Sequence, residues 1–304
     1  DNSTLDLYLC FSTGAALHIP PESHYAFPKL ILEYLRKHEI TTIFWVPFVL
    51  ASIANSGVLR VLPPRTLRNV LFAGEQMPVQ QINEWVRQVP GALFSNLYGP
   101  TEITVDCTAF TFREPFTGDI LPIGYPCRNT DVLILDETGR RCAAGEIGEL
   151  CVRGTSLALG YWNDPVKSDA VFVQNPLHSQ FRDLIYRTGD LARADERGCI
   201  TFAGRKDTQV KHAGYRIELG EIEAAVSAQP PVANCCVLYD APRSRIVLFV
   251  RYREGAPMEF GDLRRALGKR LPKYMLPTHA VVMHEFPLNA NGKIDRLKLA
   301  AALS

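Results

Sequence analysis

The sequence lacks several features that would place it in a specialised class of protein. None of its apolar runs approaches the roughly 18 residues that a membrane span needs. Its 33 basic and 32 acidic residues leave a net charge of +1, so nothing indicates a nucleic acid partner. The first residues, DNSTLDLYLC, lack the basic start of a signal peptide. We therefore expect a cytoplasmic protein that binds neither membranes nor nucleic acid.

Grouped metal ligands and paired cysteines are also missing. Eight cysteines are scattered along the chain without a C-x-x-C pair, and the seven histidines are equally dispersed. This spacing argues against a zinc site or a reactive dithiol, and we expect reduced, mostly buried thiols. What remains is an ordinary globular composition, 47% hydrophobic and 21% charged, in a 304-residue chain that suits about two domains.

Residues 1–106 alternate between two patterns. TTIFWVP, NVLFAGE and ALFSNLYG are short strand-like runs, and MPVQQINEWVRQVP has a helical pattern. FPKLILEYLRKHEI places Phe27, Ile31, Tyr34 and Leu35 on one helical face. Strands that alternate with helices predict an α/β region with a parallel sheet and flanking helices. Ligands of such sheets bind beyond the carboxyl ends of the strands, so we expect a site after NVLFAGE and ALFSNLYG.

The rest of the chain contains two regions with different sequence patterns. Residues 107–206 contain short β-rich segments punctuated by glycine, such as GELCVRG and GCITFAG, which predict a barrel-like subdomain. Residues 207–304 combine helical and strand patterns and predict a small α+β domain, with the junction near residues 204–210. Within it, GDLRRALGKRLP is an amphipathic helix with Asp262 as a possible N-cap.

NLYGPTE, residues 96–102, carries the most chemistry. Gly99 and Pro100 force a turn just past a strand, and Tyr98 offers an aromatic face on which a base can stack. The Thr101 hydroxyl can bond a phosphate oxygen, and Glu102 is a hard oxygen ligand suited to magnesium beside phosphates. A Gly-Pro turn with a solvated glutamate is the alternative interpretation.

Three other segments are weaker indicators on their own. YRTGD ends in Asp190, which can take both hydroxyls of a ribose, although such turns are structural in most proteins. GRKDTQVKHAGYRIELGEIE groups Arg205, Lys211 and two other basic side chains, suited to phosphate but also typical of a charged linker. NANGKIDR predicts a hairpin turn whose Lys293, taken alone, is a solvated charge. GELCVRGTSLALGYW has glycines of an architectural kind, and we assign it no direct chemistry.

In their order along the chain, these five segments resemble the core motifs of the adenylate-forming superfamily. That superfamily includes the amino-acid adenylation domains of nonribosomal peptide synthetases, D-alanine–carrier-protein ligases and acyl-CoA synthetases. TLDLY and LFAGE look closest to the D-alanine ligases and similar stand-alone enzymes. The resemblance spans essentially the whole chain. It implies an enzyme that joins a carboxylate to AMP from ATP with Mg²⁺ and passes the acyl group to the phosphopantetheine thiol of a carrier protein.

The resemblance also implies roles for individual residues. Tyr98 would stack on adenine, with Gly74, Glu75, Asn96 and Gly99 beside it. Thr101 would hold the α-phosphate, Glu102 the magnesium, and Asp190 the ribose hydroxyls with support from Arg205; Lys211 would belong to the same nucleotide site. Asp207 would be the hinge on which the small domain turns. Lys293 would bridge the substrate carboxylate and the α-phosphate, and the loop around Gly214 would line the thiol channel.

On the amino-acid side, the resemblance places Asp1 where an aspartate binds the substrate α-ammonium. The remaining pocket positions would be Asn2, Leu5, Phe44, Leu71, Ala73, Leu97, Val105 and Asp106. Phe44 and the leucines favour a small substrate and Asp106 a polar one, so we expect serine first and alanine second. Ala73 differs from the cysteine that D-alanine ligases carry at this position, which argues against D-alanine.

One family element has no counterpart in the sequence. The phosphate loop rich in serine, threonine and glycine is absent, and no G-x-x-x-x-G-K-[ST] segment replaces it. We therefore expect a fragment cut at Asp1 that adenylates poorly by itself, with no carrier domain after residue 304. Two other readings stay open: an acyl- or aryl-CoA ligase in which Asp1 is accidental, and a non-enzymatic nucleotide-binding module.

Overall fold

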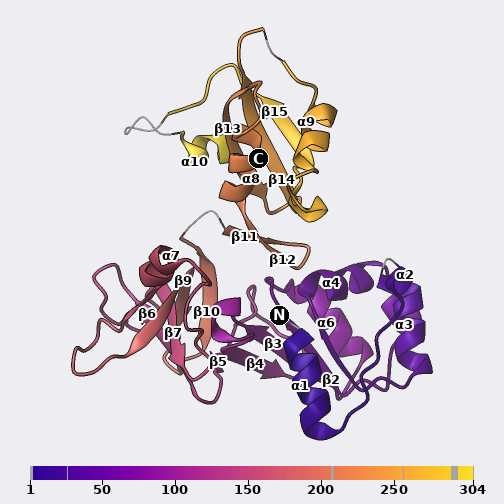
Figure 1. The fold of residues 1–304 in the computed structure, drawn as a ribbon. Helices are drawn as coiled ribbons and strands as arrows, with labels where there is room; N and C mark the ends of the chain where they lie inside the picture. The colour runs from indigo at the N-terminus through magenta and orange to yellow at the C-terminus, as the bar shows by residue number, and fades with distance from the viewer. Residues whose placement is uncertain (1–2, 26, 207–208, 256, 289–293, 304) are drawn as a thin grey trace. The chain divides into compact units, whose positions relative to one another are not determined.

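The computed structural model describes residues 3–25, 27–206, 209–255, 257–288 and 294–303. The chain forms two compact units, residues 1–206 and 207–304, which are described separately (Figure 1). The predicted architecture is confirmed: an α/β region with a parallel sheet, a curled β-rich region, and a small α+β unit.

The first sheet has five strands in the order β1-β2-β3-β4-β5. Their bounds are β1 Thr42–Trp45, β2 Asn69–Ala73, β3 Leu93–Tyr98, β4 Thr108–Phe112 and β5 Tyr125–Pro126. The first three are parallel, as predicted, while β4 and β5 add antiparallel partners. This sheet therefore continues beyond residue 106, where we expected the α/β region to stop.

Six helices belong to the described part of this region, and α3, α4, α5 and α6 contribute buried residues to its core. They are α1 Ser3–Thr13, α2 Glu22–Tyr25, α3 Pro28–Lys37, α4 Pro47–Asn55, α5 Val58–Val61 and α6 Val79–Gln88. In α3, Ile31 and Leu35 are buried as predicted, but Phe27 is 58% exposed. Phe27 precedes the helix with an extended backbone (φ −127°), so its side chain does not follow the helical period, and Leu32 is buried instead.

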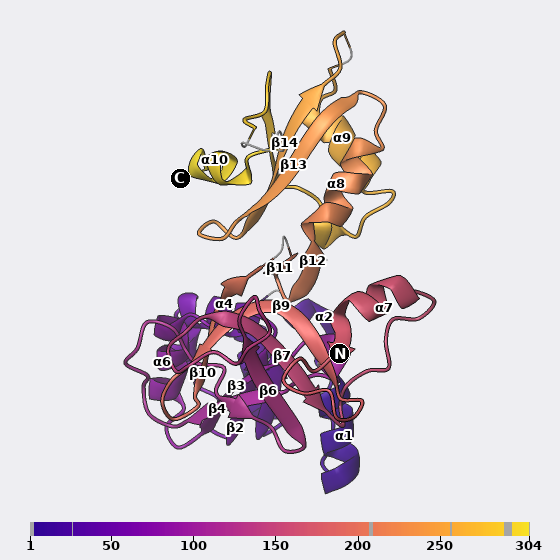
Figure 2. The same ribbon diagram turned by 90° about the vertical axis from the view of Figure 1, so that its left-hand side faces the viewer.

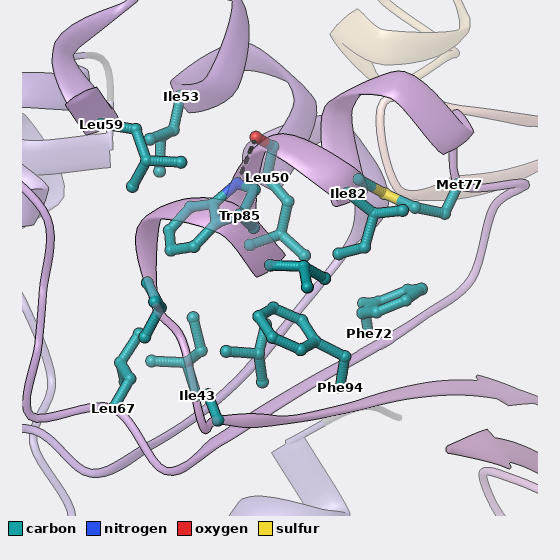
Figure 3. Close-up of a cluster of buried hydrophobic side chains, with 14 of the residues drawn as sticks. Ile43, Leu50, Ile53, Leu59, Leu67, Phe72, Met77, Ile82, Trp85 and Phe94 are labelled. Carbon is teal, nitrogen blue, oxygen red and sulfur yellow. Dashed lines mark hydrogen bonds between the residues drawn. The ribbon is translucent and has the colours of Figure 1, made fainter. Parts of the chain in front are cut away.

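The core of the region lies between the sheet and α3, α4 and α6. Trp85 of α6 is completely buried, and its indole N–H donates to the carbonyl oxygen of Leu50 in α4 at 2.9 Å (Figure 3). Ile43, Val70 and Phe94 face this core from β1, β2 and β3. The alternate residues of the same strands therefore lie on the opposite face of the sheet.

The β-rich region is a second sheet with the order β10-β9-β7-β6 (Figure 2). Its elements are β6 Thr130–Leu135, β7 Gly148–Gly154, β9 Leu184–Ala194 and β10 Ile200–Arg205, with β8 Phe172–Gln174 and α7 Pro165–Val171 at its side. All of its pairings are antiparallel, as predicted. The expected architectural role of the glycines also holds: a Cβ on Gly154 would lie 2.3 Å from the Asn129 carbonyl oxygen.

Residues 207–304 pack α8 Leu219–Ser227, α9 Phe260–Leu267 and α10 Arg296–Ala301 against β13 Val232–Asp240, β14 Arg245–Tyr252 and β15 His279–Val282. A hairpin of β11 Gln209–His212 and β12 Tyr215–Glu218 precedes them. The prediction that Asp262 caps α9 is wrong, because the helix begins at Phe260 and Glu259 is the N-cap residue. Asp262 instead lies in the first turn, where a carboxylate still complements the helix dipole. Within the described residues, no helix has the length and apolar character needed to cross a membrane.

Candidate active site

Four predicted substrate-side residues lie on one face of the parallel sheet. Phe44 of β1 is paired in register with Leu71 of β2, and Ala73 of β2 with Leu97 of β3. Paired residues of neighbouring strands share a face, and Leu71 and Ala73 are two residues apart, so all four point the same way. This face is opposite to the one that packs against α3, α4 and α6.

Leu5 of α1 and Val105 complete this group. Phe44, Ala73 and Val105 are buried, and Leu5, Leu71 and Leu97 are half-buried against them. We call these six residues the substrate-side cluster. Val105 has φ +85°, which is a strained backbone conformation for a β-branched residue.

The other three predicted substrate residues are placed differently. Asp106 follows the cluster and is half-buried. Burial raises the pKa of the Cys107 and Cys127 thiols, and the nearby Asp106 carboxylate adds to both shifts. Asp1 and Asn2 lie outside the described residues.

The predicted nucleotide residues Tyr98, Asp190 and Arg205 form one hydrogen-bonded set. The Tyr98 hydroxyl donates to one carboxylate oxygen of Asp190, and the Arg205 guanidinium donates to the other at 2.5 Å. Tyr98 is 6% exposed and Asp190 4%, so both are nearly buried. Burial, followed by the Asp190 charge, raises the pKa of Tyr98 well above its usual value, which keeps its hydroxyl protonated as a donor.

Asp190 is presented by a bulge in β9. Glu149 of β7 is paired with Leu191 and Cys151 with Arg187, so one residue of β7 faces three of β9. Thr188 stabilises the bulge, because its hydroxyl donates to the Leu150 carbonyl at 2.7 Å and accepts from the Asp190 N–H at 3.0 Å. A bulge of this kind redirects a side chain out of the regular strand pattern, here that of Asp190.

Glu102 lies in the short 3₁₀ helix η1 Thr101–Ile103, directly after β3. It is 8% exposed, and one of its carboxylate oxygens accepts from the Tyr161 hydroxyl at 2.5 Å. Burial and the Glu102 carboxylate raise the pKa of Tyr161 above its usual value, so this hydroxyl also stays protonated. Sequence reasoning missed Tyr161, because we assigned its segment no chemistry and nothing in one sequence links two residues 59 positions apart.

The remaining residues of the predicted nucleotide site line the ends of β2 and β3. Glu75 follows β2 and accepts from the Phe48 N–H at 3.2 Å, and Gly74 has φ +104°. Asn96 is buried in β3 and donates to the Pro122 carbonyl at 2.7 Å. Gly99 is half-buried after β3, and Thr101 is exposed at the start of η1.

In the small unit, the structure describes only part of what we predicted. Asp207 and Lys293 lie outside the described residues, as does the side chain of Lys211. Gly214 occupies the turn between β11 and β12 with φ +85°. Leu288 and Ile294 pair as an isolated antiparallel bridge, and the predicted hairpin turn at residues 289–293 lies outside the described residues.

An open cavity of about 620 Å³ lies elsewhere, along β6, β7 and the loop before β9. Its Arg153 is held between Asp131 at 3.0 Å and Asp183 at 2.5 Å, so its charge is already neutralised. None of the predicted site residues lines this cavity.

The arrangement of Tyr98, Asp190, Arg205 and Glu102 suits a nucleotide and its magnesium. Asp190 retains oxygen lone pairs for hydroxyl donors beyond its two present partners. Within the described part of the chain, no group of three or more His, Cys, Asp or Glu side chains could hold a metal by itself. Magnesium typically takes one or two carboxylates and completes its shell with phosphates and water, which a single Glu102 satisfies.

Comparison with known proteins identifies the family of the chain. Residues 1–162 match the AMP-binding enzyme family, and residues 221–293 match the AMP-binding enzyme C-terminal domain. The chain is 38% identical to an L-proline–[L-prolyl-carrier protein] ligase of Streptomyces coelicolor, with 98% of this chain and 56% of the ligase aligned. It is 36% identical to the enzyme of the same name from Pseudomonas fluorescens, with 99% and 58% aligned.

A solved structure is similar over nearly the whole chain. It is the Vibrio cholerae adenylation domain AlmE in complex with glycyl-adenosine-5′-phosphate, with a TM-score of 0.83 and 26% identity. The match covers 99% of this chain and 57% of AlmE. The chain thus spans a little more than half the length of the relatives that it matches. Because the family match covers more than half of its residues, this chain belongs to the AMP-binding enzyme family.

Proposed function

We propose that the protein containing this chain activates a small amino acid with ATP and transfers it to the phosphopantetheine thiol of a carrier protein. The observation that carries this proposal is the buried set of Tyr98, Asp190 and Arg205. The same strand end that supplies Tyr98 also supplies Leu97 to the substrate-side cluster. The names of the two proline ligases support both the amino-acid substrate and the carrier partner.

On the nucleotide side, each residue has a role that its position supports. Asp190 would accept hydrogen bonds from the ribose hydroxyls while Arg205 and Tyr98 hold its carboxylate in place. Glu102 would bind magnesium, which offsets phosphate charge when bound, and Tyr161 fixes the orientation of this carboxylate. The small exposed part of the Tyr98 ring would contact adenine.

Proline is our first substrate candidate, ahead of serine and alanine. All six side chains of the substrate-side cluster are apolar, and a secondary amine with a compact apolar ring satisfies such surroundings better than a hydroxyl does. The proline ligases support the same choice. Asp106 is the feature that keeps serine as a candidate.

The catalytic lysine and the hinge complete the proposal. Lys293 would stabilise the charge that develops on the α-phosphoryl oxygens when the carboxylate attacks and pyrophosphate leaves. Rotation about Asp207 would then withdraw Lys293 and bring the loop at Gly214 to the arriving thiol.

Substrate-dependent ATP–pyrophosphate exchange by the full-length protein tests the proposal. The panel contains proline, alanine, serine, glycine and phenylalanine, together with fatty and aryl acids. Exchange with proline and loading of a carrier protein in place of coenzyme A would support the proposal. Preference for a fatty or aryl acid would show a CoA ligase, and nucleotide binding without exchange would show a non-enzymatic module. The same assay on the 304-residue chain alone tests the expected poor activity of the isolated piece.

A further inference from the structure

Glu149 is a buried acidic residue that the proposed function leaves unused. It lies in the middle of the second sheet, near the start of β7, and is 7% exposed. A carboxylate is costly to bury unless its charge is paired and its oxygens accept hydrogen bonds. Its partners therefore indicate why the chain keeps an acid at this place.

The partners of Glu149 all belong to the bulge that presents Asp190 or to the end of the large unit. One carboxylate oxygen accepts from Arg187, with the Nε atom at 3.1 Å, and lies 3.8 Å from the Lys206 ammonium. The other accepts from the N–H of Gly189 at 3.3 Å. Arg187 and Gly189 precede Asp190 by three residues and one residue.

Gly189 is thus held on both sides. Its N–H donates to Glu149, and its carbonyl oxygen accepts from the N–H of Lys206 at 2.8 Å. Lys206 is the last residue of the large unit and immediately precedes Asp207. Gly189 has φ +71°, so the bulge depends on a backbone conformation that the neighbouring contacts must maintain.

We propose that Glu149 is a positioning residue that orients Asp190 toward the ribose by holding the 187–190 bulge. The backbone N–H of Lys206 holds Gly189 from its other side. This inference rests on the proposed function, because it needs Asp190 to bind the ribose. Without Glu149, the Gly189 N–H and the Arg187 guanidinium lose their shared acceptor, and the bulge keeps only its contacts through Thr188 and the Lys206 N–H. Asp190 would then keep its charge but lose its alignment with the hydroxyls.

The test compares ATP with 3′-deoxy-ATP in pyrophosphate exchange by the full-length protein. Wild type should discriminate between them by kcat/KM, because Asp190 would contact the ribose hydroxyls. Glu149→Ala should reduce this ratio by about tenfold or more and raise the KM for ATP, as expected for a lost charge-assisted hydrogen bond. Glu149→Gln should fall between the two, since its amide oxygen can still accept from Gly189. Glu196→Gln, an exposed glutamate of the same sheet region, is the matched control and should match wild type.

Asp190→Ala distinguishes failure of the proposed ribose role of Asp190 from failure of the positioning role of Glu149. If Asp190→Ala leaves the discrimination ratio unchanged, the ribose role of Asp190 in the proposed function is wrong. If Asp190→Ala abolishes the ratio while both Glu149 variants retain it, the positioning role is overturned. A purely structural Glu149 would lower the unfolding temperature and the active fraction but leave the ratio and the KM for ATP unchanged. The Glu149→Gln variant keeps the test decisive if Glu149→Ala fails to fold.

Discussion

Replacing Gly99 by alanine would test how closely the nucleotide and substrate sides are packed. A Cβ on Gly99 would lie 2.3 Å from the Val105 carbonyl oxygen, 2.6 Å from the Asp106 Cα atom and 2.9 Å from the Ile103 Cδ1 atom. Two of these three atoms belong to the backbone, which cannot rotate aside as a side chain can. Segment 105–106 must therefore move by about 1 Å to restore ordinary van der Waals contact.

The expected cost follows from this overlap. Overpacking a well-packed site costs about 1–3 kcal/mol, and a backbone clash of this size belongs at the upper end. Val105 already has a strained backbone, so a further shift of its φ and ψ angles is costly. Because the displaced residues Val105 and Asp106 are predicted to contact the amino acid, we expect the KM for the amino acid to rise more than the KM for ATP.

Urea unfolding and pyrophosphate exchange of the full-length variant measure both effects. Gly220→Ala is the matched control, because Gly220 lies in α8 and, apart from its chain neighbours and the backbone of its own helix, no atom lies within 4 Å of the new Cβ. Alanine there should be neutral or stabilise the helix by about 0.5–1 kcal/mol. If Gly99→Ala unfolds at the same urea concentration as wild type and keeps both KM values, the close approach of residues 99 and 105 is wrong.

Three further predictions concern other parts of the chain. Lys293→Ala should lower adenylation by several orders of magnitude and largely spare thioester formation from preformed adenylate; equal loss in both steps would remove its bridging role. Trp85→Phe should lower the free energy of unfolding by about 1–3 kcal/mol, because the buried Leu50 carbonyl loses its indole donor, and an unchanged urea midpoint would contradict this. Hydrogen bonds from Thr138 and the Arg140 backbone lower the pKa of Asp136 from 3.8 to about 2, so its contribution is present above 3.8 and lost as the pH falls toward 2. The stability difference between wild type and Asp136→Asn should therefore shrink over that range, and a difference independent of pH would refute the assignment.

Much of the fold follows from local sequence patterns. Apolar runs such as NVLFAGE and ALFSNLYG became β2 and β3, and the prolines at 28 and 47 occupy the first turns of α3 and α4, where a missing N–H costs nothing. Phe27 was misassigned because a helical period says nothing about where the helix begins. The extent of the first sheet was also misjudged, since pairing of β4 with β3 depends on a chain reversal after Tyr98 rather than on either strand's composition.

The candidate site was predictable where chemistry lies in contiguous motifs and not where it depends on strand register. Tyr98, Glu102 and Asp190 belong to recognisable segments. Glu149 lies in GELCVRG, to which we assigned no chemistry, because its role depends on a strand register in which one residue of β7 faces three of β9. An acid before the apolar run 150–152 of GELCVRG was the available signal, since an acid in a buried strand requires partners.

Under the proposed function, the end of β3 would serve both the amino acid and the nucleotide. Side chains alternate along a strand, so Leu97 faces the substrate-side cluster while Asn96 and Tyr98 face the opposite side. The chain then turns at Gly99 and Pro100, and Glu102 follows in η1. Adenylation requires a carboxylate and an α-phosphate to meet within bonding distance, and orientation of this kind can supply a large part of the rate. Under the proposed function, this strand end would divide its two faces between the reactants, with the proposed magnesium ligand Glu102 following it in η1.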